Sequence, residues 1–292
     1  MNPYYRPRRS MLYVPGCSMR YLNKARTLRV DSVILDLGDP ILVELKEESR
    51  RNVCEAVLAG GYGRREVVVR VNDLDSPWGR EDVKAVATAG ADAVLFPNVE
   101  STADVLEAQS LLDQSGGSHL PIMLMIESPL GVLRAEEIAS ASDRIACLVM
   151  ATSDLLNQLH GRRTPDRIAL IHSLSQVLLA GRAYDRAVVD GISTDLKDTQ
   201  SFEYACRLGR DLGFDGKSLV HPFQLAYCND AFTPKPPEIA AALEVIEALG
   251  KAHQEGRGTV VLNGRLIEGH HVKEARRLLA LADMIDKLEA GQ

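Results

Sequence analysis

Short runs of apolar residues recur along the chain between residues 10 and 220, at intervals too long for β-hairpins. Several runs, such as Val67–Val71 and Ile122–Ile126, are nearly continuous rather than alternating, which is typical of parallel strands buried on both faces. The pattern predicts these strands: Ser10–Val14, Asp31–Leu37, Glu66–Val71, Ala93–Phe96, Ile122–Ile126, Ile145–Met150, Ala187–Asp190 and Lys217–Val220.

Segments with helical periodicity lie between these runs. Ser101 and Pro165 are typical of helix starts, and Gly90 is typical of a helix end. The periodicity predicts helices over Met19–Leu28, Lys46–Leu58, Arg80–Ala89, Ala103–Gln114, Leu133–Ala141, Pro165–Ala180, Gln200–Leu212 and Pro222–Asp230. This repeated strand–helix alternation predicts an α/β fold, a (β/α)₈ TIM barrel, because an open doubly wound sheet fits fewer strands.

The pattern changes after residue 232, where several prolines interrupt the chain. Glu238–Gln254 and Val272–Leu288 then have the periodicity of amphipathic helices, with a Gly-rich stretch between them. We therefore expect a barrel domain over residues 1–232 and a C-terminal helical extension over residues 233–292.

Composition narrows the classes of protein. The 292 residues, 46% of them hydrophobic, can bury a full core, and the net charge of −6 provides no basic field for nucleic acid. No apolar segment follows the basic N-terminus, and every apolar run is far shorter than the roughly 20 residues that cross a bilayer. We expect neither a signal peptide nor a membrane span.

The five cysteines are scattered, with no C-x-x-C spacing: Cys17, Cys54, Cys147, Cys206 and Cys228. An odd, unclustered set favours reduced thiols over disulfides or a zinc site. This pattern predicts a cytoplasmic protein.

Polar residues follow many of the predicted strands, at the end that forms the active face of such barrels. They are Asp36, Asp39, Arg70, Asn72, Glu127, Asp154, Asp190 and His221. Carboxylates brought together repel unless a cation neutralises them, which favours Mg²⁺, with Mn²⁺ as an alternative. Arg70 would add a fixed positive charge beside a developing oxyanion. A structural reading remains open for single members: Asp39 and Asp190 as helix caps or loop anchors, Arg70 in a rim ion pair, and His221 in a loop.

The chain also carries eight motifs that together resemble one family: RRSMLYVPG, VILDLGD, VVVRVNDLDSPWG, DAVLFPNVES, IMLMIESPLGV, DLKD, GFDGKSLVHPFQ and VVLNGRLIEGHHVKEARRLL. They are similar to the citrate lyase β-subunit and malyl-CoA lyase family of the HpcH/HpaI aldolase superfamily, and most resemble its stand-alone citramalyl-CoA or malyl-CoA lyases. The resemblance implies a Mg²⁺-dependent lyase that cleaves a β-hydroxyacyl-CoA to a 2-oxo acid and acetyl-CoA, or condenses them.

The resemblance also implies residue roles. Glu127 and Asp154 match the metal ligands, and Arg70 matches the arginine that contacts the substrate oxygens. Backbone N–H groups of Thr152, Ser153 and Asp154 would hold the oxo-acid carboxylate. Further roles fall to Asp36 and Glu268 in catalysis, and to Arg9, Arg20 and Lys24 at the phosphates of coenzyme A. The C-terminal element would close a neighbouring subunit's site, which predicts a homotrimer or hexamer.

Three positions depart from the family pattern. Gly38 stands where the family has Glu, Asn98 where it has Lys, and Glu268 where it has Asp. Two alternatives therefore stay open. One is a citrate lyase β-subunit acting on a carrier-bound citryl thioester, and the other is a non-catalytic paralogue that binds coenzyme A or metal. Thioester hydrolysis is a variant of the lyase prediction.

Overall fold

The computed structural model describes residues 6–291. Residues 1–5, the start of the basic N-terminus in which we expect no signal peptide, lie outside the described residues. The chain divides into two compact units between Phe232 and Thr233. The part of the chain that the structure describes contains no helix long and apolar enough to span a membrane.

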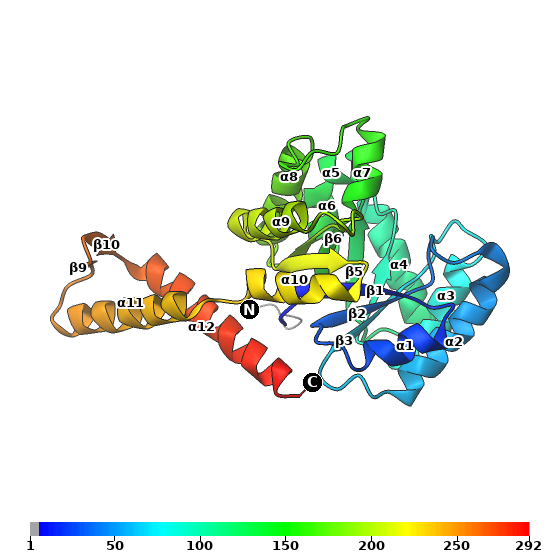
Figure 1. Ribbon diagram of the computed structural model, residues 1–292, viewed down its shortest axis with the longest axis horizontal. Helices are drawn as coiled ribbons and strands as arrows, with labels where there is room; N and C mark the ends of the chain where they lie inside the picture. The colour runs from blue at the N-terminus through cyan, green and yellow to red at the C-terminus, as the bar shows by residue number, and fades with distance from the viewer. Residues whose placement is uncertain (1–5, 292) are drawn as a thin grey trace. The chain divides into compact units, whose positions relative to one another are not determined.

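The first unit is a closed barrel of eight parallel strands, each hydrogen-bonded to the next in chain order, with the last beside the first (Figure 1). This confirms the predicted (β/α)₈ barrel. The strands are β1 (Ser10–Pro15), β2 (Ser32–Asp36), β3 (Glu66–Arg70), β4 (Ala93–Phe96), β5 (Ile122–Ile126), β6 (Ile145–Met150), β7 (Ala187–Asp190) and β8 (Gly216–Leu219).

Helices connect the strands and surround the barrel (Figure 1). They are α1 (Met19–Ala25), α2 (Lys46–Ala59), α3 (Gly79–Val86), α4 (Thr102–Gln114), α5 (Pro129–Leu133), α6 (Ala135–Ser140), α7 (Thr152–Gln158), α8 (Ile171–Ala183), α9 (Thr199–Leu212) and α10 (Leu225–Phe232), with 3₁₀ turns η1 (Val43–Leu45) and η2 (Pro222–Gln224).

Several predicted helices differ from the structure in their boundaries, and two of these differences have a local cause. The helix expected from Pro165 begins only at Ile171, because Arg167 has a φ of 55°, which a right-handed helix does not allow. The helix expected over Leu133–Ala141 is two short helices, and the first starts earlier, where the Ser128 side chain accepts the N–H of Gly131.

The barrel is packed on both sides of its wall. An inner cluster, which includes Met11, Ile34, Leu95 and Met123, fills the barrel interior, and a larger cluster lies between the strands and the helices. The strands therefore need apolar residues on both faces, which explains their continuous apolar runs.

The second unit contains α11 (Pro236–Gln254), an antiparallel hairpin of β9 (Val260–Leu262) and β10 (Arg265–Ile267), and α12 (Gly269–Glu289) (Figure 1). Asn263 and Gly264 connect the hairpin with φ values of 50° and 77°. Asn-Gly favours such a two-residue turn, because both residues tolerate positive φ. Helices α11 and α12 pack together around a small core of Leu249, Ala252 and Ile267.

Candidate active site at the carboxyl ends of the strands

A buried ion pair joins the ends of β2 and β3. The register of these strands places Asp36 beside Arg70. The guanidinium donates from Nε to Oδ1 at 2.7 Å and from Nη2 to Oδ2 at 2.9 Å, so two parallel bonds hold it flat. Burial alone would lower the pKa of Arg70, but the Asp36 carboxylate more than offsets this and raises it. Arg70 is a fixed cation.

Both carboxylate oxygens of Asp36 accept hydrogen bonds from the protein. Each accepts one from Arg70, and Oδ1 also accepts the N–H of Gly38 at 2.8 Å. The sequence prediction made Asp36 catalytic. Its hydrogen bonds fit a positioning role, in which it orients Arg70.

Arg70 also contacts a cavity of about 110 Å³ at the barrel mouth. Its Nη1 takes no part in the Asp36 pair and lies 3.8 Å from the sulfur of Met125. The ring of Tyr13 lies 5.3 Å from the guanidinium carbon. The cavity lining includes Tyr13, Asp36, Arg70, Ser153 and Asp154. A cation and a carboxylate from distant parts of the chain thus face the same small space.

Glu127 directly follows β5 and is buried, with 8% of its surface exposed. Burial raises the pKa of Glu127, and the negative charge of Asp154 adds to that effect. The N–H of Asn98 opposes it by donating to Oε1 at 2.5 Å. Glu127 and Asp154 therefore lie close enough for their charges to interact, as the strand-end argument expects.

Asp154 is exposed and stands in the first turn of α7. The first N–H groups of any helix have no intrahelical acceptor, so those of Thr152, Ser153 and Asp154 remain available to a carboxylate. The described residues contain no group of three or more His, Cys, Asp or Glu side chains that could hold a metal ion. Two carboxylates are nevertheless sufficient protein ligands for Mg²⁺, which keeps waters and substrate oxygens as its other ligands.

Asp190 has a structural environment. It is fully buried and pairs with Lys217 at 2.8 Å and with Arg167 at 2.6 Å. Burial alone would raise the pKa of Asp190, but the two cations lower it to about 2. Asp39 and His221 are exposed, and the His221 ring caps η2. Asp190 and His221 thus have structural surroundings, whereas the exposed carboxylate of Asp39 lies 3.7 Å from Nη1 of Arg70.

The structure corrects the expectation for Arg9. Because Arg9 precedes β1, it lies at the amino end of the barrel, opposite the mouth. It is 2% exposed, and its guanidinium pairs with Asp31 at 2.8 Å. Arg9 therefore cannot meet a ligand at the mouth. Arg20 and Lys24 lie on α1, which follows the mouth end of β1, and both are exposed.

Glu268 belongs to the second unit and is the N-cap of α12. Its N–H donates to Nδ1 of His271 at 3.0 Å, and its carbonyl oxygen accepts the N–H of His271 at 3.0 Å. Its carboxylate is partly exposed and lies 3.5 Å from Nδ1 of His270. The structure thus fixes the backbone of Glu268 and leaves its carboxylate accessible.

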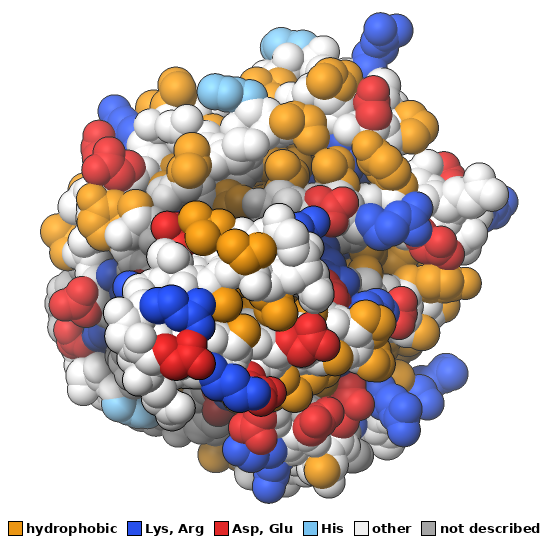
Figure 2. Space-filling model, turned by 90° about the vertical axis from the view of Figure 1, so that its left-hand side faces the viewer, with side chains coloured by type: hydrophobic (Ala, Val, Ile, Leu, Met, Phe, Trp, Pro, Cys, Tyr) orange, Lys and Arg blue, Asp and Glu red, His pale blue; other side chains and the backbone are white. Residues whose placement is uncertain are grey.

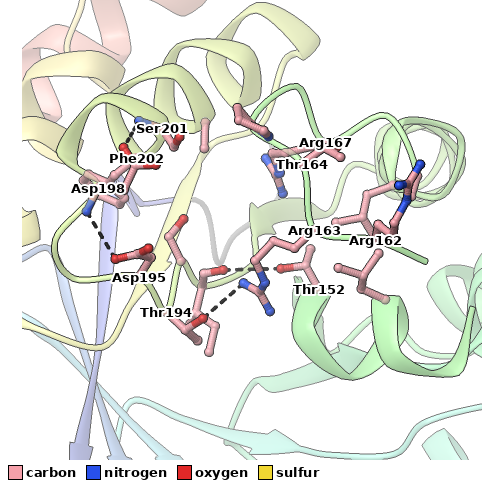
Figure 3. Close-up of a pocket in the computed structure, with 17 residues that line it drawn as sticks. Thr152, Arg162, Arg163, Thr164, Arg167, Thr194, Asp195, Asp198, Ser201 and Phe202 are labelled. Atoms are coloured by element: carbon pink, nitrogen blue, oxygen red, sulfur yellow. Dashed lines mark hydrogen bonds between the residues drawn. The ribbon is translucent and has the colours of Figure 1, made fainter. Parts of the chain in front are cut away.

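A second, larger cavity of about 260 Å³ lies between the segment after α7 and the segment after β7. Arg163 reaches across it: Nη1 donates to Thr194 at 3.1 Å (Figure 3), and Nη2 donates to Ser153 at 3.4 Å. Asp195 and Asp198 line the opposite side. None of Arg70, Glu127 and Asp154 lines this cavity, whereas Arg70 and Asp154 both line the smaller one, which is therefore the candidate active site.

Charge is mixed on the surface. On the face shown in Figure 2, Lys and Arg side chains are interspersed with Asp and Glu side chains. This face therefore carries no continuous basic patch.

Comparison with known proteins gives consistent matches. The family model for HpcH/HpaI aldolase/citrate lyase matches residues 9–222. A (3S)-malyl-CoA thioesterase of Cereibacter sphaeroides is 40% identical over 98% of each chain. The citrate lyase subunit beta of Leuconostoc mesenteroides is 36% identical over 95% of this chain and 94% of that one.

A solved structure is similar over the same length. Protein CitE from Mycobacterium tuberculosis, in complex with magnesium, acetoacetate and coenzyme A, has a TM-score of 0.77 and 25% identity, covering 96% of this chain and 99% of that one. The similarity therefore includes both units of the present chain.

Proposed function

The chain belongs to the HpcH/HpaI aldolase/citrate lyase family, and we propose that it is a Mg²⁺-dependent lyase for a β-hydroxyacyl-CoA of the malyl-CoA or citramalyl-CoA type. The observation that carries the proposal is the fixed Arg70–Asp36 pair in the same cavity as Asp154, with Glu127 close to Asp154. Relatives named for malyl-CoA and citrate chemistry support the substrate class.

The donor set fits the metal. Glu127 and Asp154 offer hard carboxylate oxygens. Burial raises the pKa of Glu127, the charge of Asp154 adds to that effect, and a cation between the two carboxylates would oppose both effects. When bound, Mg²⁺ would supply Lewis-acid polarisation of the substrate oxygens. The magnesium complex of the similar mycobacterial protein supports this assignment.

The chain's own residues would carry the rest of the reaction. A base removes the β-hydroxyl proton, the C–C bond breaks, and its electron pair moves into the thioester enolate, which is then protonated to acetyl-CoA. The new carbonyl belongs to the 2-oxo acid. Arg70 would stabilise the negative oxygen, and first-turn N–H groups at Thr152–Asp154 would bind the oxo-acid carboxylate.

Glu268 would act as the base or acid, supplied by a neighbouring subunit of a homotrimer or hexamer. Its accessible carboxylate on a fixed backbone suits that role. Arg20 and Lys24 would meet the phosphates of coenzyme A. The five free cysteines are consistent with a cytoplasmic location.

Thioester hydrolysis is the second candidate function. It is favoured by the (3S)-malyl-CoA thioesterases, whose identity to this chain exceeds that of the citrate lyase subunits. In hydrolysis, water attacks the thioester carbonyl and the products are the free hydroxy acid and coenzyme A. Because the chain is also similar to citrate lyase β-subunits, a carrier-bound citryl thioester is an alternative substrate.

The experiment compares products. Purified protein with Mg²⁺ is given malyl-CoA or citramalyl-CoA, and 2-oxo acid is measured as its hydrazone while free thiol is measured in parallel. Oxo acid without thiol establishes cleavage, whereas thiol without oxo acid establishes hydrolysis. The Glu127→Ala variant is the control. Binding of coenzyme A without either product would favour a non-catalytic paralogue and overturn the proposal.

A further inference from the structure

Gly38 follows β2 in the loop that faces Arg70, and its backbone does not require glycine. Its φ lies outside the left-handed region, so any residue could adopt this conformation. The space beside it is occupied instead. A Cβ at position 38 would lie 2.7 Å from Nη2, 2.8 Å from Cζ and 2.9 Å from Nε of Arg70. The guanidinium lies where a side chain would be.

The backbone at Gly38 is held from both sides. Its N–H donates to Oδ1 of Asp36 at 2.8 Å, and its carbonyl accepts from Nζ of Lys46 at 2.8 Å. Lys46 is buried, and its other two hydrogen bonds go to the carbonyl of Leu37 and to Oδ1 of Asn72. All three N–H donors of the Lys46 ammonium are therefore used: two on carbonyl oxygens of the loop and one on the side chain of Asn72. The loop has little freedom to retreat from Arg70.

Arg70 would have to move instead. A Cβ at position 38 would clash with three atoms of Arg70. Two of them, Nε and Nη2, are the atoms that donate hydrogen bonds to Asp36. A methyl group at position 38 would push them away by several tenths of an ångström before an ordinary contact distance is reached. Moving the end of a side chain leaves the backbone in place, but here it breaks the parallel pair that fixes the guanidinium.

We propose that Gly38 is a positioning residue for Arg70 in the reaction proposed above, and that the missing side chain sets where the guanidinium stands in the cavity. The inference rests on the proposed function for its catalytic consequence. That the geometry of the Arg70–Asp36 pair depends on Gly38 follows from the contacts alone and does not require the proposed function.

The first test compares Gly38→Ala with Gly250→Ala, a matched control because a Cβ at Gly250 meets nothing within 4 Å and φ is again ordinary. We expect Gly38→Ala to lower kcat at least roughly tenfold, since displacement by about 1 Å can cost about a hundredfold. Because the Arg70–Asp36 pair is buried, its disruption should also lower the thermal midpoint by a few °C. Wild-type kcat would overturn the proposal.

The second test is a double-mutant cycle with Arg70→Lys, because lysine lacks the two nitrogens that crowd position 38. If Gly38 acts through Arg70, adding Gly38→Ala to Arg70→Lys should change kcat less than about twofold. Independent effects that simply multiply would contradict the inference.

A third measurement needs no activity. The Nε–H of Arg70, bonded to a buried carboxylate, should give a separate ¹H–¹⁵N signal that Arg70→Lys removes and so identifies. Gly38→Ala should shift this signal or lose it to exchange, and Gly250→Ala should not. If the Arg70 signal is unchanged in Gly38→Ala, the inference is wrong, even if the enzyme is active. A changed signal in a protein that turns over no thioester rejects the proposed function alone.

Discussion

Arg70 holds Asp36 through two parallel hydrogen bonds, and a lysine cannot reproduce that geometry, since an ammonium is a single point donor. Arg70→Lys keeps the positive charge, but the charged group is no longer held in one orientation by two parallel hydrogen bonds. We expect kcat to fall about a hundredfold, as for loss of a preorganised oxyanion donor, while the affinity for coenzyme A changes little. Steady-state kinetics and calorimetry would separate these two effects.

The control for this prediction is Arg80→Lys, which alters an exposed pair with Glu107. Its kinetics should match wild type, because exposed ion pairs contribute little. An Arg70→Lys enzyme with raised KM but unchanged kcat would show that Arg70 binds substrate without stabilising the transition state.

Asp190 gives a pH prediction. Its pKa is about 2 in the folded protein, below the unfolded value of about 3.9. A depressed pKa contributes stability that is present above the unfolded value and is lost as pH falls through the folded value. Asp190→Asn should therefore lower the free energy of unfolding by about 3 kcal/mol at pH 7, since it leaves Lys217 and Arg167 buried without their carboxylate.

The measurement is urea unfolding of both proteins between about pH 6 and 3. The difference in unfolding free energy should stay constant down to about pH 4 and shrink below it. A difference that is independent of pH over this range would mean that the pKa of Asp190 is the same in the folded and unfolded chain, contrary to the lowered pKa described above.

Part of the candidate site could be predicted from the sequence, because the last residue of each parallel strand lies at the mouth of the barrel. Asp36, Arg70 and Glu127 end or directly follow their strands, so their shared face was predictable. The Asp36–Arg70 pair was not, since it depends on the register between β2 and β3 that barrel closure sets. The prediction for Arg9 was wrong because Arg9 precedes β1 and so lies at the amino end of the barrel, where its guanidinium pairs with Asp31.

At the level of elements, the strands were predicted better than the helices. Burial on both faces gives each strand an apolar run that depends little on context. Short helices depend on their surroundings: α7 has seven residues, and the start of α8 is delayed by Arg167, which turns out of helical geometry and pairs with Asp190. Tertiary contacts therefore decided these boundaries, and a helical period alone could not give them.

The closure of the barrel between β8 and β1 gives an element-scale prediction. A Cβ at Gly216 would lie 1.8 Å from the carbonyl oxygen of Arg8 and 2.6 Å from that of Arg9, so backbone would have to separate. Gly216→Ala should lower the free energy of unfolding by at least about 3 kcal/mol.

The matched control is Gly258→Ala, where a Cβ meets nothing within 4 Å and φ is ordinary. Its midpoint in urea should stay near wild type. Equal midpoints for Gly216→Ala and wild type would show that the strand ends can separate without cost, contrary to the close-packed closure described above.

For the whole molecule, the candidate reaction residues are divided between two compact units. Arg70, Glu127 and Asp154 belong to the barrel, whereas Glu268 belongs to the unit that begins at Thr233. The proposal that Glu268 serves a neighbouring subunit has a direct consequence. A site then needs an intact barrel from one chain and an intact C-terminal unit from another.

Mixing two inactive variants tests this consequence. Arg70→Lys damages only the barrel and Glu268→Gln only the C-terminal unit, so refolded or co-expressed mixtures should contain some sites in which both contributions are wild type. For random assembly at equal amounts, about a quarter of the sites should be intact, because each contribution is wild type about half the time. Activity near that fraction of wild type supports a shared site. Mixtures no more active than their parents, at an oligomeric state shown by light scattering to contain both chains, would place Glu268 outside any neighbouring subunit's chemistry.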